Sequence, residues 1–300
     1  MAVAIKELHT GREVTELDPT AFRPNPDELA FLQKETGIED RDELVKHVVT
    51  TQQEVYRSRP YYCIRQFFFT RLQIARHPEY DYVLSIAKTD KDATFLDLAC
   101  CVGTDVRKLV ADGWPGHHAF ATDLHTDYWD FGHKLFRDKD RCQVRFLGGD
   151  FFADDVLRID EPLNTWTLYN LLFWPQTRLA NLNDLKGQLR ALFSCSFFHL
   201  FDLPTQQTLA DRVALMLSKK PGSIAFGSHL SCGPGREPGE LYGLPWLHNP
   251  QSWERLWDRE KFECRTEMRR TEEFLGGHPD SGEYKDLGEY YSLVWSVRRK

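Results

Sequence analysis

The spacing of apolar residues divides the chain into two parts with different periods. From Asp27 onward the apolar side chains recur every three or four residues, which is the period of amphipathic helices. Asp40 followed by Glu43 resembles a capping box at the start of one such helix. We therefore predict an N-terminal arm and helical cap over residues 1–90, followed by a larger domain over residues 91–300.

From Ala93 the pattern changes to short apolar runs that alternate with helical segments. The expected strands cover residues 94–98, 118–122, 143–147, 190–195 and 223–229, and the expected helices between and after them include 105–111, 129–136, 205–218 and 250–257. Two last runs, 262–268 and 290–297, alternate in the manner of antiparallel partners. Five strand–helix units and a terminal hairpin predict an α/β fold with a doubly wound, mostly parallel sheet of seven strands.

Two segments of the larger domain do not follow this alternation. The run from Trp166 to Trp174 is apolar throughout, and periodicity does not separate a strand from a buried helix there. It lies in an insertion-like segment, Asn164 to Gly187, whose role the sequence leaves open. The stretch from Gly233 to Gly243 is rich in Gly and Pro and is expected to be a loop with the makings of a lid.

Charge and composition narrow the possible partners. The formal net charge is −7 and no cluster of five or more Lys or Arg occurs, so we expect no nucleic-acid partner. No apolar stretch approaches a signal peptide or a membrane span, which favours a soluble, cytoplasmic protein without a membrane partner. The seven cysteines show no paired CxxC spacing and are expected to be reduced thiols. Nothing in the sequence indicates the oligomeric state.

The turn after the first strand carries the strongest candidate for chemistry. In a doubly wound sheet a ligand binds at the carboxyl ends of the strands, beside the first strand and its turn. From Asp97 to Gly103 the chain reads acid-x-small-x-small-x-Gly, with Ala99 and Cys101 as the small residues that let the backbone approach a ligand. This is neither the dinucleotide-binding spacing nor a phosphate-binding loop.

Acidic residues also follow the second and third strands. Asp123 ends the second strand, where a carboxylate can accept both hydroxyl groups of a ribose. Asp150 and Phe151 follow the third strand, where an adenine amino group and ring face would lie. Three acids after three successive strands predict an adenosyl-binding site.

These residues resemble a known family. The turn, Asp123 and Asp150 look like the class I S-adenosylmethionine-dependent methyltransferases, whose sheet is Rossmann-like. The blocks Tyr62-Cys63-Ile64-Arg65, Phe95 to Gly103, Phe198-His199-Leu200-Phe201 and His248-Asn249-Pro250 resemble fungal secondary-metabolite O-methyltransferases, including carboxyl O-methyltransferases of meroterpenoid pathways. The resemblance covers about residues 55–260, although Ala99 and Cys101 stand where the superfamily commonly has Gly.

The resemblance implies S-adenosyl-L-methionine as cofactor and residues 91–300 as the catalytic domain. The predicted cofactor-binding residues are Tyr62, Arg65, Asp97, Ala99, Cys101, Gly103, Asp123, Leu124, Asp150, Phe151 and Ser194. Arg65 is expected to reach in from the helical cap and bind a carboxylate of cofactor or substrate with its planar fork.

Methyl transfer from a sulfonium depends mainly on alignment of the acceptor, so a strong base is optional. His199 is the candidate catalytic residue because it lies just after the fourth strand, and Phe198, Trp246 and His248 are candidate substrate contacts. An ionised carboxylate acceptor needs positioning donors, whereas a hydroxyl acceptor is helped by a base. No metal is predicted, and Asp202 is expected to cap the next helix.

The predicted function is methyl transfer to a carboxylate or hydroxyl oxygen of a small-molecule secondary metabolite. The alternative is a protein of this fold that binds S-adenosylmethionine but catalyses a non-methylating cyclisation or elimination. A regulatory module would leave the acids at the strand ends without a purpose.

Overall fold

The computed structural model describes residues 16–159, 179, 181–241, 243–271 and 290–300. The apolar run from Trp166 to Trp174, and with it the choice between strand and helix, lies outside the described residues. Of the insertion-like segment only 179 and 181–187 are described, and Leu182–Leu185 form a short 3-10 helix there.

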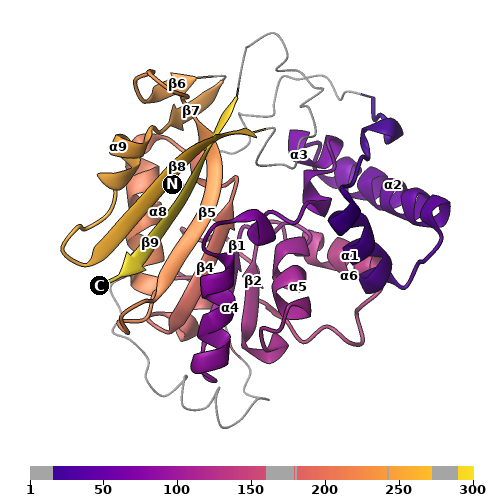
Figure 1. Ribbon diagram of the computed structural model, residues 1–300, viewed down its shortest axis with the longest axis horizontal. Coiled ribbons are helices and arrows are strands. Elements are labelled where there is room, and N and C mark those ends of the chain that lie inside the picture. The colour runs from indigo at the N-terminus through magenta and orange to yellow at the C-terminus, as the bar shows by residue number, and fades with distance from the viewer. Residues whose placement is uncertain (1–15, 160–178, 180, 242, 272–289) are drawn as a thin grey trace.

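A seven-stranded sheet in the order β3-β2-β1-β4-β5-β9-β8 forms the centre of the fold (Figure 1). Its strands are β1 (Thr94–Leu98), β2 (Ala119–Thr122), β3 (Arg145–Phe146), β4 (Leu189–Cys195), β5 (Ile224–Ser231), β8 (Phe262–Arg270) and β9 (Tyr291–Arg299). The first five are parallel, and β9 is antiparallel to both β5 and β8. The predicted Rossmann-like, mostly parallel sheet of seven strands is confirmed, although β3 is shorter than expected.

Helices cover both faces of the sheet, which explains why its central strands are continuously apolar. The helices of the larger domain and the one before it are α4 (Tyr80–Thr89), α5 (Thr104–Ala111), α6 (Asp127–Phe136), α8 (Leu203–Met216) and α9 (Pro250–Glu254). Leu96 and Leu98 of β1 pack in one core with α8, whereas Phe95 packs in the other with α4 and α5. In Figure 1, α4 and α5 lie in front of the strands and α8 lies behind them.

The N-terminal helices pack beside the sheet rather than on it. They are α1 (Pro26–Thr36), α2 (Arg41–Ser58) and α3 (Tyr62–Arg65), followed by the 3-10 helices η2 (Phe68–Thr70) and η3 (Ile74–Arg76). Leu32, Leu44 and Val48 join Leu135 of α6 in a third core. Asp40 caps α2 by accepting the Glu43 N–H at 2.8 Å, which is one of the two hydrogen bonds of the expected capping box. The domain boundary near residue 90 remains a prediction.

The remaining elements are short 3-10 helices and a two-stranded hairpin. They are η1 (Pro19–Ala21), η4 (Gly116–His118), η6 (Phe198–Leu200), β6 (Gly239–Leu241) and β7 (Leu244–Leu247). The expectation of a loop throughout 233–243 is wrong at 239–241, because these residues pair with β7. The role of this segment as a lid remains a prediction. Asp202 accepts the Thr205 N–H and caps α8, as predicted.

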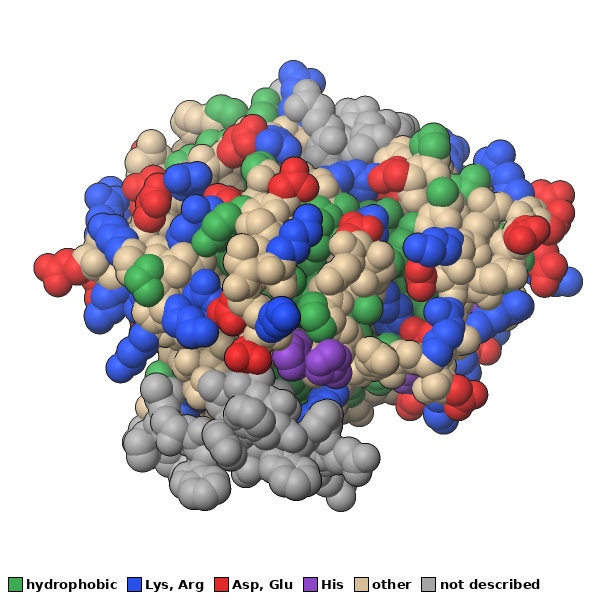
Figure 2. All heavy atoms as spheres, turned by 60° about the horizontal axis from the view of Figure 1, so that its bottom comes forward, with side chains coloured by type: hydrophobic (Ala, Val, Ile, Leu, Met, Phe, Trp, Pro, Cys, Tyr) green, Lys and Arg blue, Asp and Glu red, His purple; other side chains and the backbone are tan. Residues whose placement is uncertain are grey.

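The outer surface carries charges of both signs. Figure 2 shows Lys and Arg side chains interspersed with Asp and Glu over the face it presents. Among the described helices, none has the length and apolarity needed to cross a membrane.

Candidate functional site

A cavity of about 380 Å³ opens at the carboxyl edge of the parallel strands. The segments that follow β1, β2, β3 and β4 line it, together with His229 of β5 and Ser292 of β9. Residues of the N-terminal region, among them Tyr62 and Arg71, close another side. This volume lies in the range typical of small-molecule sites, about 300–1,000 Å³.

The loop after β1 has an unusual backbone. Ala99, Cys101 and Gly103 have φ angles of 62°, 52° and 72°, so alternate residues adopt the left-handed conformation. For residues with a Cβ atom this conformation costs roughly 1–2 kcal/mol each, which explains why small residues and Gly are required at these positions. Ala99 and Cys101 line the cavity.

Asp123 fastens this loop to the end of β2. One carboxylate oxygen accepts the Cys101 N–H at 2.9 Å and the other accepts the His125 N–H at 2.9 Å. Burial raises the pKa of Asp123 to about 6 despite these hydrogen bonds. Each oxygen retains a lone pair, so the side chain can still accept hydroxyl hydrogens from within the cavity that it lines.

Asp97 is a buried carboxyl group of the cavity wall. It is 3% exposed, and its Oδ2 has no hydrogen-bond partner among the described residues. Burial, followed by the neighbouring Asp105 carboxylate, raises the pKa of Asp97 well above its usual range. Burial also raises the pKa of Asp105 to about 7. The wall beside β1 therefore carries two buried acidic groups, Asp97 and Asp105.

Four more of the predicted cofactor-binding residues also line the cavity. Leu124, Asp150 and Phe151 line it, as does Tyr62. Asp150 accepts the Phe152 N–H at 2.9 Å, which shapes the turn after β3, and Phe151 is buried.

Three predicted cofactor residues are not among the residues that line the cavity: Gly103, Arg65 and Ser194. A Cβ atom on Gly103 would lie 2.5 Å from Trp129 Cζ3, so this glycine serves close packing of the loop on α6. The Arg65 guanidinium lies over the Tyr62 ring, 5.3 Å from its centre. The buried Ser194 of β4 lies opposite Gly227 of β5. Direct contact of these residues with a cofactor remains a prediction.

The predicted substrate residues Phe198, Trp246 and His248 are likewise absent from the cavity lining. Phe198 is 1% exposed and packs edge-on against Trp253, with ring centres 4.8 Å apart. His248 is buried, and its Nδ1 lies 2.9 Å from the Ser252 hydroxyl. Phe198 and His248 lie beside His229, which does line the cavity, and contact of Phe198, Trp246 and His248 with a substrate remains a prediction.

His199 does line the cavity. Its Nδ1 accepts the backbone N–H of Leu230 at 3.1 Å, which ties the turn after β4 to β5. Burial lowers the pKa of His199 to about 4, so the ring is neutral at pH 7.

Several cavity residues were not predicted from the sequence. The described residues offer no hydrogen-bond partner to Arg71 Nε, Thr122 Oγ1, the Tyr128 hydroxyl or either ring nitrogen of His229, all buried. Thr122 ends β2 and His229 ends the strand expected over 223–229, so the rule that found Asp123 could have found them. Arg71 carries no comparable sequence pattern.

The unpartnered polar atoms of the cavity can be compared with the groups that an adenosyl cofactor would present to them. Buried polar groups in folded proteins are nearly always hydrogen-bonded to protein, water or ligand. The cavity has hydroxyl groups and carboxylates beside β1 and β2, as a nucleoside requires, and acidic groups suited to a sulfonium and an ammonium. The residues present therefore fit S-adenosylmethionine.

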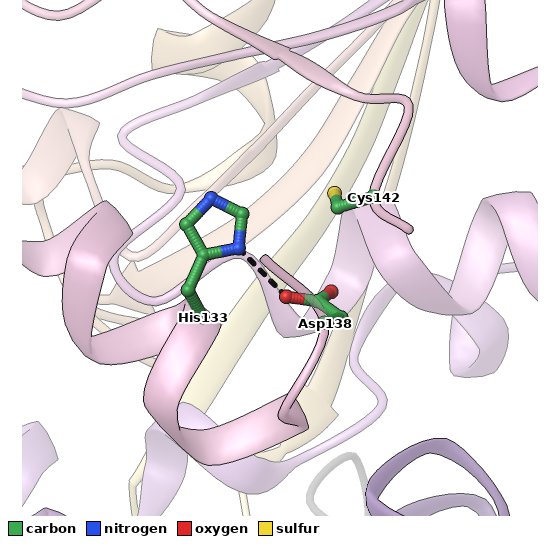
Figure 3. A group of neighbouring side chains, drawn as sticks. All are labelled: His133, Asp138 and Cys142. Carbon is green, nitrogen blue, oxygen red and sulfur yellow. Dashed lines mark hydrogen bonds and ion pairs between the residues drawn. The ribbon is translucent and has the colours of Figure 1, made fainter. Parts of the chain in front are cut away.

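A separate cluster has the residue types of a metal site. Ligand atoms of His133, Asp138 and Cys142 lie within 4.8 Å of one another (Figure 3). Asp138, however, also accepts hydrogen bonds from Arg107, at 2.6 Å from Nε and 3.2 Å from Nη2. A guanidinium already neutralises this carboxylate, so the cluster is better explained as an ion pair that fixes α5 against the end of α6.

Comparison with known proteins identifies the family. Residues 17–70 match the model of the meroterpenoid methyltransferase N-terminal domain. The chain is 32% identical over 229 residues to the O-methyltransferase phiE of a fungal species, covering 75% of this chain and 68% of the relative. It is 30% identical over 237 residues to the Asnovolin E/Chermesin D methyltransferase nvfJ of Aspergillus novofumigatus, covering 78% of this chain and 76% of the relative.

A solved S-adenosylmethionine-dependent methyltransferase from Mesorhizobium loti aligns with a TM-score of 0.43 and 15% identity, over 75% of this chain and 100% of that chain. A likeness this distant bears no weight beside the fungal relatives. The sheet order, the cavity at its carboxyl edge and the fungal relatives agree. The chain belongs to the family of fungal secondary-metabolite methyltransferases and is an S-adenosylmethionine-dependent enzyme.

Proposed function

We propose that this enzyme methylates a carboxylate oxygen of a largely apolar small molecule. The observation that carries the proposal is the hydrogen bond from the Leu230 N–H to Nδ1 of His199. The phiE relative is named an O-methyltransferase, which agrees with an oxygen acceptor.

The Leu230 hydrogen bond fixes the tautomer of His199. A backbone amide can only donate, so Nδ1 must be the bare nitrogen. In a neutral imidazole the hydrogen then resides on Nε2. His199 therefore presents an N–H donor to the cavity and has no free lone pair with which to remove a proton.

A donor in this position suits a carboxylate better than a hydroxyl group. S-adenosylmethionine supplies a methyl group that is already activated on a sulfonium. A carboxylate arrives ionised and needs only donors that hold one oxygen in line, whereas a hydroxyl group needs a base. The Nε2–H of His199 acts as such a positioning donor.

His229 supports the same assignment from the neighbouring strand. It lines the cavity, is 2% exposed, and neither ring nitrogen has a partner within the described part of the chain. Burial holds the pKa of His229 well below its usual range, and the nearby His248 and His199 lower it further. A weakly basic ring is a poor proton acceptor but still offers one N–H to a carboxylate.

Apolar side chains make up much of the wall around the two histidines. Phe152, Phe197, Leu200, Phe201 and Leu244 line this part of the cavity. Their surfaces favour a hydrophobic acceptor, in which burial of each CH₂ group contributes about 0.8 kcal/mol.

The test uses S-adenosylmethionine labelled in the methyl group, with hydrophobic carboxylic acids and their matched hydroxymethyl analogues. We expect label in the acids, released as volatile methanol by mild alkali because methyl esters hydrolyse and ethers do not. Alkali-stable label from the alcohols would move the acceptor to a hydroxyl group. A product that is isomeric or dehydrated and carries no label would point to a non-methylating reaction.

Two substitutions test the donor role of His199. His199→Gln retains an N–H near the Nε2 position, whereas His199→Phe retains only the ring shape. We expect the Phe variant to lose kcat/KM by roughly 10- to 150-fold, corresponding to a hydrogen bond to a charged group, and the Gln variant to lose much less. An equal loss in both variants would indicate that His199 acts as a base.

A further inference from the structure

Arg71 is a buried cation in the wall of the cavity. It follows η2, on the segment that leads from the N-terminal helices to α4. The side chain is 4% exposed and lines the same cavity as Asp97 and Asp105. A buried guanidinium needs partners, because removing its charge from water is expensive.

The hydrogen bonds of the Arg71 guanidinium come from Nη1. Nη1 donates to Glu28 Oε2 at 2.8 Å and to the Arg23 carbonyl at 3.2 Å. Nε is buried and has no hydrogen-bond partner among the residues described. Nε belongs to the edge that can bind a carboxylate with two parallel N–H donors.

The facing wall supplies charges of the opposite sign. Asp105 accepts the Ile74 N–H at 2.9 Å, which brings the start of α5 against the segment that carries Arg71. The cavity thus offers a cation and acidic groups together. The amino-acid end of the cofactor has the matching pair, a carboxylate and an ammonium.

We propose that Arg71 binds the α-carboxylate of the cofactor's methionine moiety and that Glu28 of α1 holds the guanidinium in place. Arg71 is thereby positioned for the role that the sequence suggested for Arg65. Glu28 is fully buried and is a positioning residue, since its contact with the cofactor is through Arg71. The N-terminal helices then take part in cofactor binding through one ion pair.

The binding of two ligands distinguishes a cofactor-binding role of Arg71 from a purely structural one. S-adenosylhomocysteine carries the amino-acid end, and 5′-methylthioadenosine lacks it. We expect Arg71→Met to weaken binding of S-adenosylhomocysteine by roughly 10- to 150-fold in calorimetry, the range for hydrogen bonds to charged groups. Binding of 5′-methylthioadenosine should stay within about twofold. Arg71→Lys should lie between, because it keeps the charge and loses the fork.

Glu28→Gln tests the positioning role. It retains the shape of the side chain and should weaken S-adenosylhomocysteine selectively, by less than Arg71→Met. Arg190→Met is the matched control, since Arg190 is also ion-paired to an acid, Asp90, but lies at the amino end of β4, away from the cavity. Its affinities for both ligands should not change.

Two results would overturn the proposal. One is unchanged affinity for S-adenosylhomocysteine in Arg71→Met. The other is an equal loss of both ligands in Arg71→Met and Arg71→Lys, including loss through misfolding, which assigns Arg71 a structural role.

Discussion

Replacing Gly103 by alanine separates two roles for this glycine, contact with the cofactor and packing of the loop after β1. Gly103 has φ +72°, where a residue with a Cβ atom pays roughly 1–2 kcal/mol. The new Cβ would also lie 2.5 Å from Trp129 Cζ3 and 2.7 Å from Arg107 Nη1.

Neither neighbour can yield easily. The Trp129 ring stacks on Phe146 with centres 5.1 Å apart, and Arg107 is held by Asp138. Overpacking of this kind costs about 1–3 kcal/mol. The free energy of unfolding should therefore fall by about 2–5 kcal/mol in Gly103→Ala.

Gly37→Ala is the matched control. Gly37 ends α1 with φ +70°, and no atom lies within 4 Å of its would-be Cβ. The free energy of unfolding of Gly37→Ala should fall only by the cost of the left-handed backbone, about 1–2 kcal/mol. The effect of alanine on the unfolded chain is the same in both variants and cancels when they are compared. Urea unfolding followed by circular dichroism gives both values. Values within about 0.5 kcal/mol of each other would refute the packing argument, and loss of S-adenosylhomocysteine affinity without extra destabilisation would favour contact with the cofactor.

Two further outcomes follow from the buried charges. Burial raises the pKa of Asp105 to about 7 and that of Asp123 to about 6. Without cofactor, the two protonated side chains therefore contribute fully to the free energy of unfolding below the ordinary carboxyl pKa of about 4. This contribution is lost as the pH rises through about 6 and about 7. Because S-adenosylmethionine carries one more positive charge than S-adenosylhomocysteine, calorimetry should show its relative affinity rising from about pH 5.5 to about pH 8, and a constant ratio would contradict this. Asp138→Asn should lower the free energy of unfolding by about 3 kcal/mol, since it leaves the buried Arg107 uncompensated, whereas a loss below about 1 kcal/mol would show that the pair is unimportant.

The sheet and the acids at its edge could be predicted because they depend on local sequence. Continuous apolar runs identify buried parallel strands, and the residue that ends such a run lies at the ligand-binding edge. Asp97 and Asp123 were located in this way, and both line the cavity. His229 ends the strand expected over 223–229 and was open to the same argument.

What could not be predicted depends on contacts between distant segments. The tautomer of His199 is set by Leu230, 31 residues away, and Arg71 is held by Glu28, 43 residues away. Phe67 has φ +57° just before η2, a turn that no Gly or Asn announces and that brings Arg71 rather than Arg65 to the cavity. The close packing of Gly103 on Trp129 could not be predicted either, because sequence alone does not tell which way a side chain at this position would point.

The place of β9 in the sheet has a consequence for synthesis of the chain. β9 follows β8 along the chain, yet it lies between β5 and β8. Until residues 291–299 have left the ribosome, β5 and β8 each present an unpaired edge, which is a template for pairing with other chains. Translation products that stop before β9 should therefore aggregate. They should also fail to retain the cofactor, because Ser292 of β9 lines the cavity.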